Sequence, residues 1–256
     1  MSKPILAISG NDIFSGGGLH ADLTTYAREQ LHGFVAVTCL TRMTDKGFDV
    51  VPIDAGIVAD QLASLKDVDF AAIKIGLLPT VEVADVALAF VKNHADRPVV
   101  LDPVLVCKET PDLEVSRLRD ELLKFLPYTT IVTPNLVEAQ ILTQMDIQTV
   151  EDMKLAAEKL HTLGTKYVVV KGGNRLQKAQ AIDVFYDGKE FQVLTYQVLE
   201  TNNVGAGCTF ASSIAAKLAL GMPIDRAVVE AKGFVYQAIA QADQYGVNQQ
   251  FRREYD

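Results

Sequence analysis

Short apolar runs alternate with longer amphipathic segments along most of the chain. Runs typical of buried strands lie at 5–9, 34–40, 71–75, 98–101, 130–133 and 167–170. Segments with the hydrophobic spacing of helices lie at 19–31, 57–65, 81–93, 113–125, 150–163, 209–220 and 223–242. Continuous apolar strands that alternate with helices predict an α/β fold, in which a mostly parallel central sheet has helices on both faces.

Two local signals refine this pattern. Asp187 and Gly188 separate the strand-like runs 181–186 and 191–196, and this dipeptide predicts a β-hairpin. Thr149 stands before the helical segment 150–163 with Asp152 three residues later, close to a capping box. The sequence contains no linker, internal repeat or low-complexity segment. We therefore expect a single domain over residues 1–256.

Charge and cysteine content narrow the class of protein. The chain has 256 residues, 49% of them hydrophobic, and a formal net charge of −8. This acidic balance argues against nucleic acid as a partner, although a local pocket for a small phosphate ligand remains compatible with it. The three cysteines lack the spacing of a zinc site and do not form an even set. With no signal-peptide layout and no run long enough to span a bilayer, a soluble cytoplasmic protein with no membrane partner is expected.

A glycine-rich segment directly before an apolar helix suggests an anion site. In this segment, Gly205-Ala206-Gly207-Cys208-Thr209, glycine lets the main chain approach a phosphate. The unpaired N–H groups at the start of the following helix point toward the same place. A thiol at a helix start is expected to have a lowered pKa, which would make Cys208 a base or a nucleophile. The alternative is a glycine turn followed by a buried cysteine.

Polar and glycine residues recur where the expected strands end. In an open parallel sheet the ligands bind at the carboxyl ends of the strands, so these residues are the candidates for chemistry. They are 10–12 with the glycines 16–18, then 41–44, 74–76, 102–104, 133–135 with Glu138, 171–173, and 205–208. Such a set is hard to explain by core packing alone.

These segments resemble the ribokinase-like superfamily, and within it the branch of hydroxymethylpyrimidine kinases and the pyridoxal kinases similar to them. The matching motifs are SGND with SGGG and ADL (9–23), IKIGLL (73–78), VLDPV (100–104), TPNLVEA (133–139), VKGG (170–173) and GAGCT (205–209). They lie in order over almost the whole chain. The resemblance implies a ribokinase-like fold and an ATP-dependent kinase.

The resemblance also implies roles for the residues around the glycine turn. Gly205, Ala206 and Gly207 would form the anion hole for the transferred phosphoryl group, and Cys208 would take the proton of the accepting hydroxyl. ATP-binding residues are expected at Lys171, Asn135, Thr209 and Gly173. For Lys171 a surface position at a strand end is an equal alternative.

Magnesium is the second expected cofactor. Glu138, three residues after Asn135 in an N-x-x-E motif, would help to place Mg²⁺ through water, with Asp102 as a nearby carboxylate. Mg²⁺ keeps several of its waters, so few direct protein ligands are expected. Asn135 is equally compatible with a helix N-cap after Pro134, and the two roles do not exclude each other.

Two positions bear on the substrate. Cys107 lies in a segment that resembles the mobile lid of this branch, and a thiol there would attack the aldehyde of pyridoxal. Met43 stands where hydroxymethylpyrimidine kinases usually carry a glutamine that binds the aminopyrimidine. An amino group left unpaired in a closed pocket costs about 1–3 kcal/mol. Asp12, Gly18 and Val106 are expected to line the same substrate site.

Together these residues favour phosphorylation of the 5′-hydroxyl of pyridoxal, with ATP as the donor. Hydroxymethylpyrimidine (phosphate) kinase of thiamine biosynthesis is the alternative within the same class. A non-catalytic vitamin B6 binding protein is the alternative from another class, but a carrier would need no phosphate and metal apparatus. A homodimer is expected.

Overall fold

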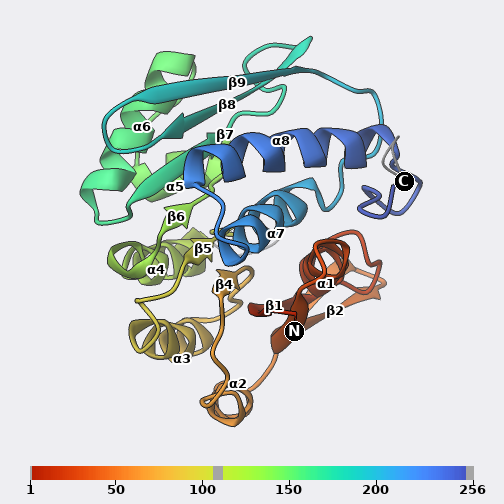
Figure 1. The fold of residues 1–256 in the computed structure, drawn as a ribbon, viewed down its shortest axis with the longest axis vertical. Coiled ribbons are helices and arrows are strands. Elements are labelled where there is room, and N and C mark those ends of the chain that lie inside the picture. Colours follow the sequence, from red (N-terminus) through yellow and green to blue (C-terminus); the bar gives the residue numbers. More distant parts are fainter. Residues whose placement is uncertain (1, 106–111, 252–256) are drawn as a thin grey trace.

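One nine-stranded sheet runs through the molecule (Figure 1). The structure, a computed structural model, describes residues 2–105 and 112–251. The strands lie in the order β3-β2-β1-β4-β5-β6-β7-β8-β9. They are β1 (Pro4–Asn11), β2 (His32–Thr44), β3 (Gly47–Pro52), β4 (Ala72–Ile75), β5 (Val99–Leu101), β6 (Ile131–Val132), β7 (Tyr167–Lys171), β8 (Gln180–Tyr186) and β9 (Phe191–Gln197).

The sheet is parallel from β2 to β7. Strands β3, β8 and β9 are antiparallel to their neighbours, so the sheet is mostly parallel, as expected. β2 and β4 lie on opposite sides of β1. The chain therefore leaves β1 on one side and returns on the other, and such a switch point opens a crevice at the carboxyl ends of the strands.

Helices cover both faces of the sheet, again as expected. On one face lie α2 (Ala55–Ser64), α3 (Val81–Lys92), α4 (Asp112–Leu123), α5 (Leu136–Thr143) and α6 (Val150–Thr162), with the short 3-10 helix η1 (Leu126–Tyr128) after α4. On the other face lie α1 (Gly18–Arg28), α7 (Ala206–Ala219) and α8 (Ile224–Ala240). Figure 1 shows α7 and α8 on the side of the sheet opposite α3 and α4.

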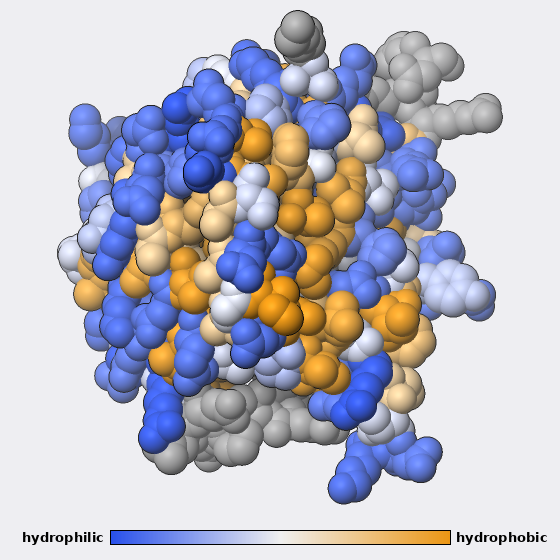
Figure 2. Space-filling view, turned by 90° about the horizontal axis from the view of Figure 1, so that it is seen from below, coloured by the Kyte–Doolittle hydropathy of each residue, from blue (hydrophilic) through white to orange (hydrophobic). Residues whose placement is uncertain are grey.

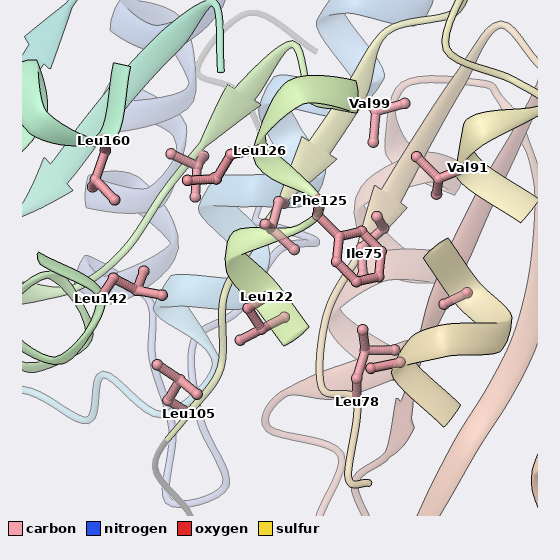
Figure 3. Close-up of a cluster of buried hydrophobic side chains, with 14 of the residues drawn as sticks. Ile75, Leu78, Val91, Val99, Leu105, Leu122, Phe125, Leu126, Leu142 and Leu160 are labelled. Carbon is pink, nitrogen blue, oxygen red and sulfur yellow. The ribbon is translucent and has the colours of Figure 1, made fainter. Parts of the chain in front are cut away.

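Alternate residues of the central strands pack into two separate hydrophobic cores, one on each face of the sheet. In β4, Ile73 and Ile75 point toward α2–α6, whereas Ala72 packs on the face of α1, α7 and α8. Figure 3 shows part of the first core, in which Ile75 lies with Val91 of α3, with Leu122 of α4 and with Phe125, which lies just after α4. This period of two means that Lys74, between the two isoleucines, faces α1 and α7.

Polar side chains fix the starts of several helices. Thr149 accepts from the N–H of Asp152, and the Asp152 carboxylate accepts from the N–H of Thr149, so the near-capping box before α6 is a complete one. Asp54 caps α2 in a similar way, by accepting from the N–H groups of Gly56 and Ile57. These bonds satisfy N–H groups that the helices cannot satisfy internally.

The second strand is longer than the apolar pattern predicts, and the strand after it was not predicted. β2 continues past residue 40 and pairs with β3 in a hairpin that projects beyond β1. The last residues of β2, 41–44, are largely polar, so the apolar run ends before the strand does. Ladder hydrogen bonds and the ion pair between Arg42 and Asp49, 2.8 Å apart, hold this extension, which we call the flap (residues 41–50).

The surface mixes charged and apolar groups. Figure 2 shows, on the face seen from below Figure 1, apolar side chains gathered in a band between hydrophilic ones. Several large apolar residues on and near the flap are exposed: Ile13, Phe14, Leu40, Met43 and Phe48. Over the described ranges, none of the helices combines the length and apolarity that crossing a bilayer requires.

The cap of α6 gives a test of this architecture. Replacing Thr149 with alanine leaves the N–H of Asp152 without its acceptor and should destabilise the protein by about 1 kcal/mol, or about 2–4 °C in melting temperature. Thr162→Ala is the matched control, because this exposed threonine at the end of the same helix bonds only to the carbonyl of Lys159. Equal melting temperatures for the two variants would contradict the cap assignment.

Candidate active site

A left-handed glycine turn precedes α7. Gly205 has a φ of 85°, and a Cβ there would lie 1.6 Å from the carbonyl oxygen of Gly16, so only glycine fits. The first hydrogen bond of the helix runs from Thr209 N–H to the Gly205 oxygen (2.9 Å). The N–H groups of Gly207 and Cys208 precede that bond and are not used by the helix. They form an anion site at the positive end of the helix dipole.

The helix begins earlier than its hydrophobic spacing predicts. The spacing marks Thr209 as the first residue, but α7 begins at Ala206, because its first turn faces the anion site and carries no apolar residue pattern. Thr209 itself is fully buried. Its hydroxyl donates to the Gly205 oxygen (2.8 Å) and accepts from Gln249 (3.0 Å). This predicted ATP ligand therefore uses its side chain to hold the glycine turn in place.

Cys208 lies where two helices begin. The main-chain N–H of Gly18, the first residue of α1, donates to the Cys208 sulfur. A Cβ at Gly17 would lie 3.7 Å from that sulfur and 3.6 Å from a carboxylate oxygen of Asp12. Asp12 also accepts from the N–H of Gly17 (2.8 Å), which is the turn-forming role typical of this residue type. Three predicted site residues, Asp12, Gly18 and Cys208, are thus brought together.

Burial raises the pKa of the Cys208 thiol to about 11. The ammonium of Lys74 and the N–H of Gly18 oppose this rise, whereas the carboxylates of Asp102 and Asp22 add to it. The expectation of a lowered pKa is therefore wrong, because removal of the thiolate from water outweighs the helix dipole and the lysine. At pH 7 about one thiol in 10⁴ is ionised.

The second cluster joins the ends of β5, β6 and β7. The Lys171 ammonium contacts a carboxylate oxygen of Asp102 at 2.8 Å, with side-chain exposures of 15% and 4%. Asn135 caps α5 by accepting from Glu138 N–H (3.0 Å), and the Glu138 carboxylate accepts from Asn135 N–H (2.7 Å). The N-cap reading of Asn135 is therefore confirmed. Lys171 lies within the protein, so the surface alternative for it does not hold.

Glu138 is unusual for an acidic residue. Burial raises the pKa of its carboxyl to about 7, although the ammonium of Lys171 and the N–H of Asn135 favour the ionised form and Asp102 disfavours it. A carboxyl that titrates near neutrality beside a lysine is typical of a functional site.

A cavity of about 370 Å³ opens beside the glycine turn. Five predicted residues line it, namely Asn135, Lys171, Gly173, Ala206 and Gly207, and Gly173 has a φ of 54°. Residues that the sequence did not single out complete the wall: Arg175, Asp183, Tyr196, Phe210, Lys232 and Tyr236. Lys232 and Asp183 form an ion pair of 2.5 Å, and the rings of Tyr196 and Tyr236 lie 4.8 Å apart.

These groups fit a nucleoside triphosphate. The cavity supplies apolar and aromatic walls for a base, while Lys171 and the first N–H groups of α7 lie where phosphates would end. A Cβ at Gly207 would lie 3.4 Å from the Lys171 ammonium, so this ammonium lies beside the first turn of α7. Glu138 and Asp102 suit a magnesium ion held mainly by water and phosphate. The described residues contain no cluster of three or more potential metal ligands.

The remaining predicted substrate residues are only partly placed. Met43 lies in the flap and pairs with Phe48 of β3, and 58% of its surface is exposed. It is on the same side of β2 as Thr41, whose hydroxyl accepts from the N–H of Ile13 in the loop beyond β1 (2.9 Å). The flap is thus tied to the loop of Asp12. Val106 and Cys107 fall outside the described residues.

Lys74 is the main functional candidate that the sequence did not assign. It stands in an otherwise apolar strand, and its ammonium contacts both oxygens of Asp22 (2.9 and 3.0 Å) with no exposure of either side chain. A lysine inside a buried strand and an aspartate inside a buried helix were the available signals. Neither shows that the two side chains meet.

Comparison with known proteins identifies the family of this chain. The family model described as phosphomethylpyrimidine kinase matches residues 12–252. A pyridoxine kinase of Bacillus subtilis is 38% identical over 93% of this chain and 90% of its own length. A hydroxymethylpyrimidine/phosphomethylpyrimidine kinase of Synechococcus elongatus is 36% identical over 93% of this chain and 92% of its own length. The crystal structure of an ADP complex of Bacillus subtilis pyridoxal kinase superposes with a TM-score of 0.91 at 36% identity, over 97% and 98% of the two chains.

The fold, the anion site and the nucleotide cavity define an ATP-dependent small-molecule kinase with the ribokinase-like fold. More narrowly, the chain belongs to the phosphomethylpyrimidine kinase family, which also matches the resemblance found in its motifs. The sequence-based expectations of fold, enzyme class and use of ATP are confirmed.

The raised pKa of Glu138 predicts a specific pH dependence of stability. The unfolded carboxyl ionises near pH 4.5, whereas the folded one keeps its proton until about pH 7. Between these values the unfolded state binds fewer protons, so the free energy of unfolding falls as the pH rises. Glu138→Gln, which retains the capping acceptor, lacks this titration.

In urea unfolding at pH 5, 6, 7 and 8, the variant should gain stability relative to the wild type up to about pH 7. The gain should reach up to about 3 kcal/mol and then level off. Parallel pH profiles for the two proteins would contradict the raised pKa.

Proposed function

We propose that this kinase transfers the γ-phosphoryl group of ATP to the 5′-hydroxyl of pyridoxal, giving pyridoxal 5′-phosphate for vitamin B6 salvage. The observation that carries the proposal is the place of Cys208. Its thiol adjoins the anion site of α7, the N–H of Gly18 and, across Gly17, the Asp12 carboxylate. An acceptor hydroxyl bound beside Asp12 therefore lies next to both a proton acceptor and a phosphate site.

Each group of this site has a separate task in the transfer. The hydroxyl oxygen attacks the γ-phosphorus, its proton passes to the Cys208 thiolate, and the bond to the β-phosphate oxygen breaks to release ADP. The N–H groups after Gly205 stabilise charge on the transferred phosphoryl group, and Lys171 stabilises charge on the neighbouring phosphates. Positioning and charge supply most of the rate, so the small ionised fraction of Cys208 suffices as acceptor.

Magnesium is expected to take part as the partner of ATP. Glu138 and Asp102 would hold it through water, and bound Mg²⁺ would neutralise charge on the β- and γ-phosphates. Glu138 must lose its proton to do this, because only the carboxylate attracts the ion. Its present bond to the N–H of Asn135 holds the carboxylate at the start of α5 in either protonation state.

The choice of pyridoxal rests on Cys107 and Met43. The thiol of Cys107 adds across the aldehyde, so that a sulfur–carbon bond forms and the carbonyl oxygen takes up a proton, giving a hemithioacetal. Met43 offers no hydrogen bond to an aminopyrimidine. The chain is similar both to a pyridoxine kinase and to a hydroxymethylpyrimidine kinase, at 38% and 36% identity, so these two residues rather than the identities favour vitamin B6.

One experiment separates the proposed function from its rivals. ADP release should be measured in parallel with pyridoxal, pyridoxine and hydroxymethylpyrimidine at equal concentrations. Turnover should be greatest with pyridoxal, because only pyridoxal carries the aldehyde. Turnover with hydroxymethylpyrimidine alone would identify a thiamine-pathway kinase, and binding of pyridoxal without any ADP release would identify a carrier.

The broader setting is also part of this proposal. We expect one kinase domain over residues 1–256, in the cytoplasm, with small molecules rather than nucleic acid or membrane as partners. Exposed Leu40, Met43 and Phe48 favour a homodimer through the flap region. Sedimentation equilibrium should give twice the chain mass, and Met43→Lys with Phe48→Lys should weaken the association.

Loss of the proton acceptor tests the role of Cys208. Cys208→Ala should reduce turnover more than tenfold, a loss above about 1.4 kcal/mol in transition-state stabilisation, while ATP still binds to the main-chain anion site. Cys208→Ser is the matched control, because it has nearly the same shape but a far less acidic group, and it should lose activity as well. Turnover above about a tenth of wild type in the alanine variant would exclude Cys208 as the base.

A change at Cys107 tests the aldehyde. Adding pyridoxal should alter the near-ultraviolet absorbance of the bound vitamer, and Cys107→Ala should abolish this change. Turnover of pyridoxal should fall far more than turnover of pyridoxine, because only the aldehyde is held covalently for transfer. Equal losses with the two substrates would assign Cys107 a general role in place of aldehyde capture.

A further inference from the structure

A fully buried ion pair lies beneath the candidate active site. Lys74 of β4 contacts both carboxylate oxygens of Asp22 of α1, at 2.9 and 3.0 Å, and neither side chain is exposed. Ser212 of α7 donates its hydroxyl to the same carboxylate. The three residues therefore connect β4 to α1 and α7, the two helices whose first turns lie beside Cys208.

The positions of these residues along their helices are informative. Ser212 follows Cys208 by four residues in α7, and Asp22 follows Gly18 by four residues in α1. Residues four apart share a helix face, so Ser212 lies one turn after the residue that carries the thiol, and Asp22 lies one turn after Gly18, whose N–H donates to the thiol sulfur. A shift of Asp22 would move both helix starts relative to each other, and with them the Gly18 N–H that donates to Cys208.

The ammonium itself lies toward the site end of the strand. A Cβ at Gly76, the residue directly after β4, would lie 2.8 Å from Nζ of Lys74. Charge at this depth acts on Cys208 through protein rather than through water, so it is weakly screened. The other charged groups that act on the thiol include the carboxylates of Asp102 and Asp22 and the ammonium of Lys171.

Fold stability alone is a poor explanation for this pair. Removing two charges from water costs several kcal/mol per ion, and well-packed apolar residues often replace such pairs without loss. The surrounding face is already apolar, with Ala72, Val100 and Ile214 fully buried. A cation placed next to a forming thiolate has a use that an apolar residue lacks.

We propose that Lys74 is a positioning residue for the transfer: through Asp22 and Ser212 it fixes the starts of α1 and α7 around Cys208, and its positive charge stabilises the thiolate. This inference rests on the proposed role of Cys208 as proton acceptor. It assigns the thiol a second lysine, in addition to Lys171, whose ammonium lies on the nucleotide cavity.

The test replaces the pair as a unit. Lys74→Met with Asp22→Asn removes both charges at nearly constant volume and leaves no unpaired ion. The readout is the rate at which iodoacetamide alkylates Cys208 as a function of pH, resolved by peptide mass spectrometry so that alkylation of Cys107 is followed separately in the same samples. Because lysine acts on the thiol more strongly than aspartate, alkylation of Cys208 should become about tenfold slower at pH 8.

A second variant and a control keep the test decisive. Asp22→Asn alone keeps the cation and removes its counter-charge, so Cys208 should alkylate faster, a change of opposite sign. Lys217→Met removes a buried lysine at the far end of α7, where it pairs with Glu29 and Glu230, and should leave Cys208 unchanged. An unchanged alkylation profile in both Asp22 variants, in protein with native circular dichroism, would overturn the proposal.

Turnover separates this inference from the proposed function. In the double variant kcat with pyridoxal should fall about tenfold, with KM for ATP within about twofold of wild type, because the nucleotide cavity is untouched. Slower alkylation with unchanged kcat would support the coupling of Lys74 to the thiol and would count against Cys208 as the proton acceptor.

Discussion

The active site depends on the contact between two glycine loops. Gly205 and Gly16 approach so closely that any side chain on Gly205 would overlap the carbonyl of Gly16. This contact sets the start of α7 against the loop that leads into α1, and Cys208 lies between them. Helix dipoles, main-chain donors and the thiol converge because these two main chains touch. The sheet supplies the frame, since both loops leave the carboxyl ends of its strands.

Two separate electrostatic environments result. Around Cys208 the protein disfavours charge, so burial leaves the thiol protonated at rest, and Lys74 moderates the effect. Around Lys171 opposite charges are gathered within contact distance of one another, ready for a polyanion. The first environment suits a proton acceptor that is needed only briefly, and the second suits a ligand with permanent charge. A phosphoryl transfer to a hydroxyl requires both.

Much of this could be predicted from the sequence, because the decisive signals are local. Apolar strands between amphipathic helices gave the doubly covered sheet, and Gly205 to Cys208 gave the anion site. The flap was not predicted, because its strands are polar and are held by ladder bonds and the Arg42–Asp49 pair. The rise in the pKa of Cys208 was not predicted either. Desolvation depends on all the chain around a group, and the pairing of Lys74 with Asp22 joins residues 52 positions apart.

The flap also determines how the open end of the sheet meets other molecules. β3 is an edge strand of six residues that ends at Pro52, and it carries Asp49 in an ion pair with Arg42. Short length, charge and proline all discourage the addition of a foreign strand. The sheet is therefore protected against growing by main-chain pairing at this edge. Any molecule that docks there meets the side chains of Leu40, Met43 and Phe48 instead, so recognition at the flap depends on shape and apolar area.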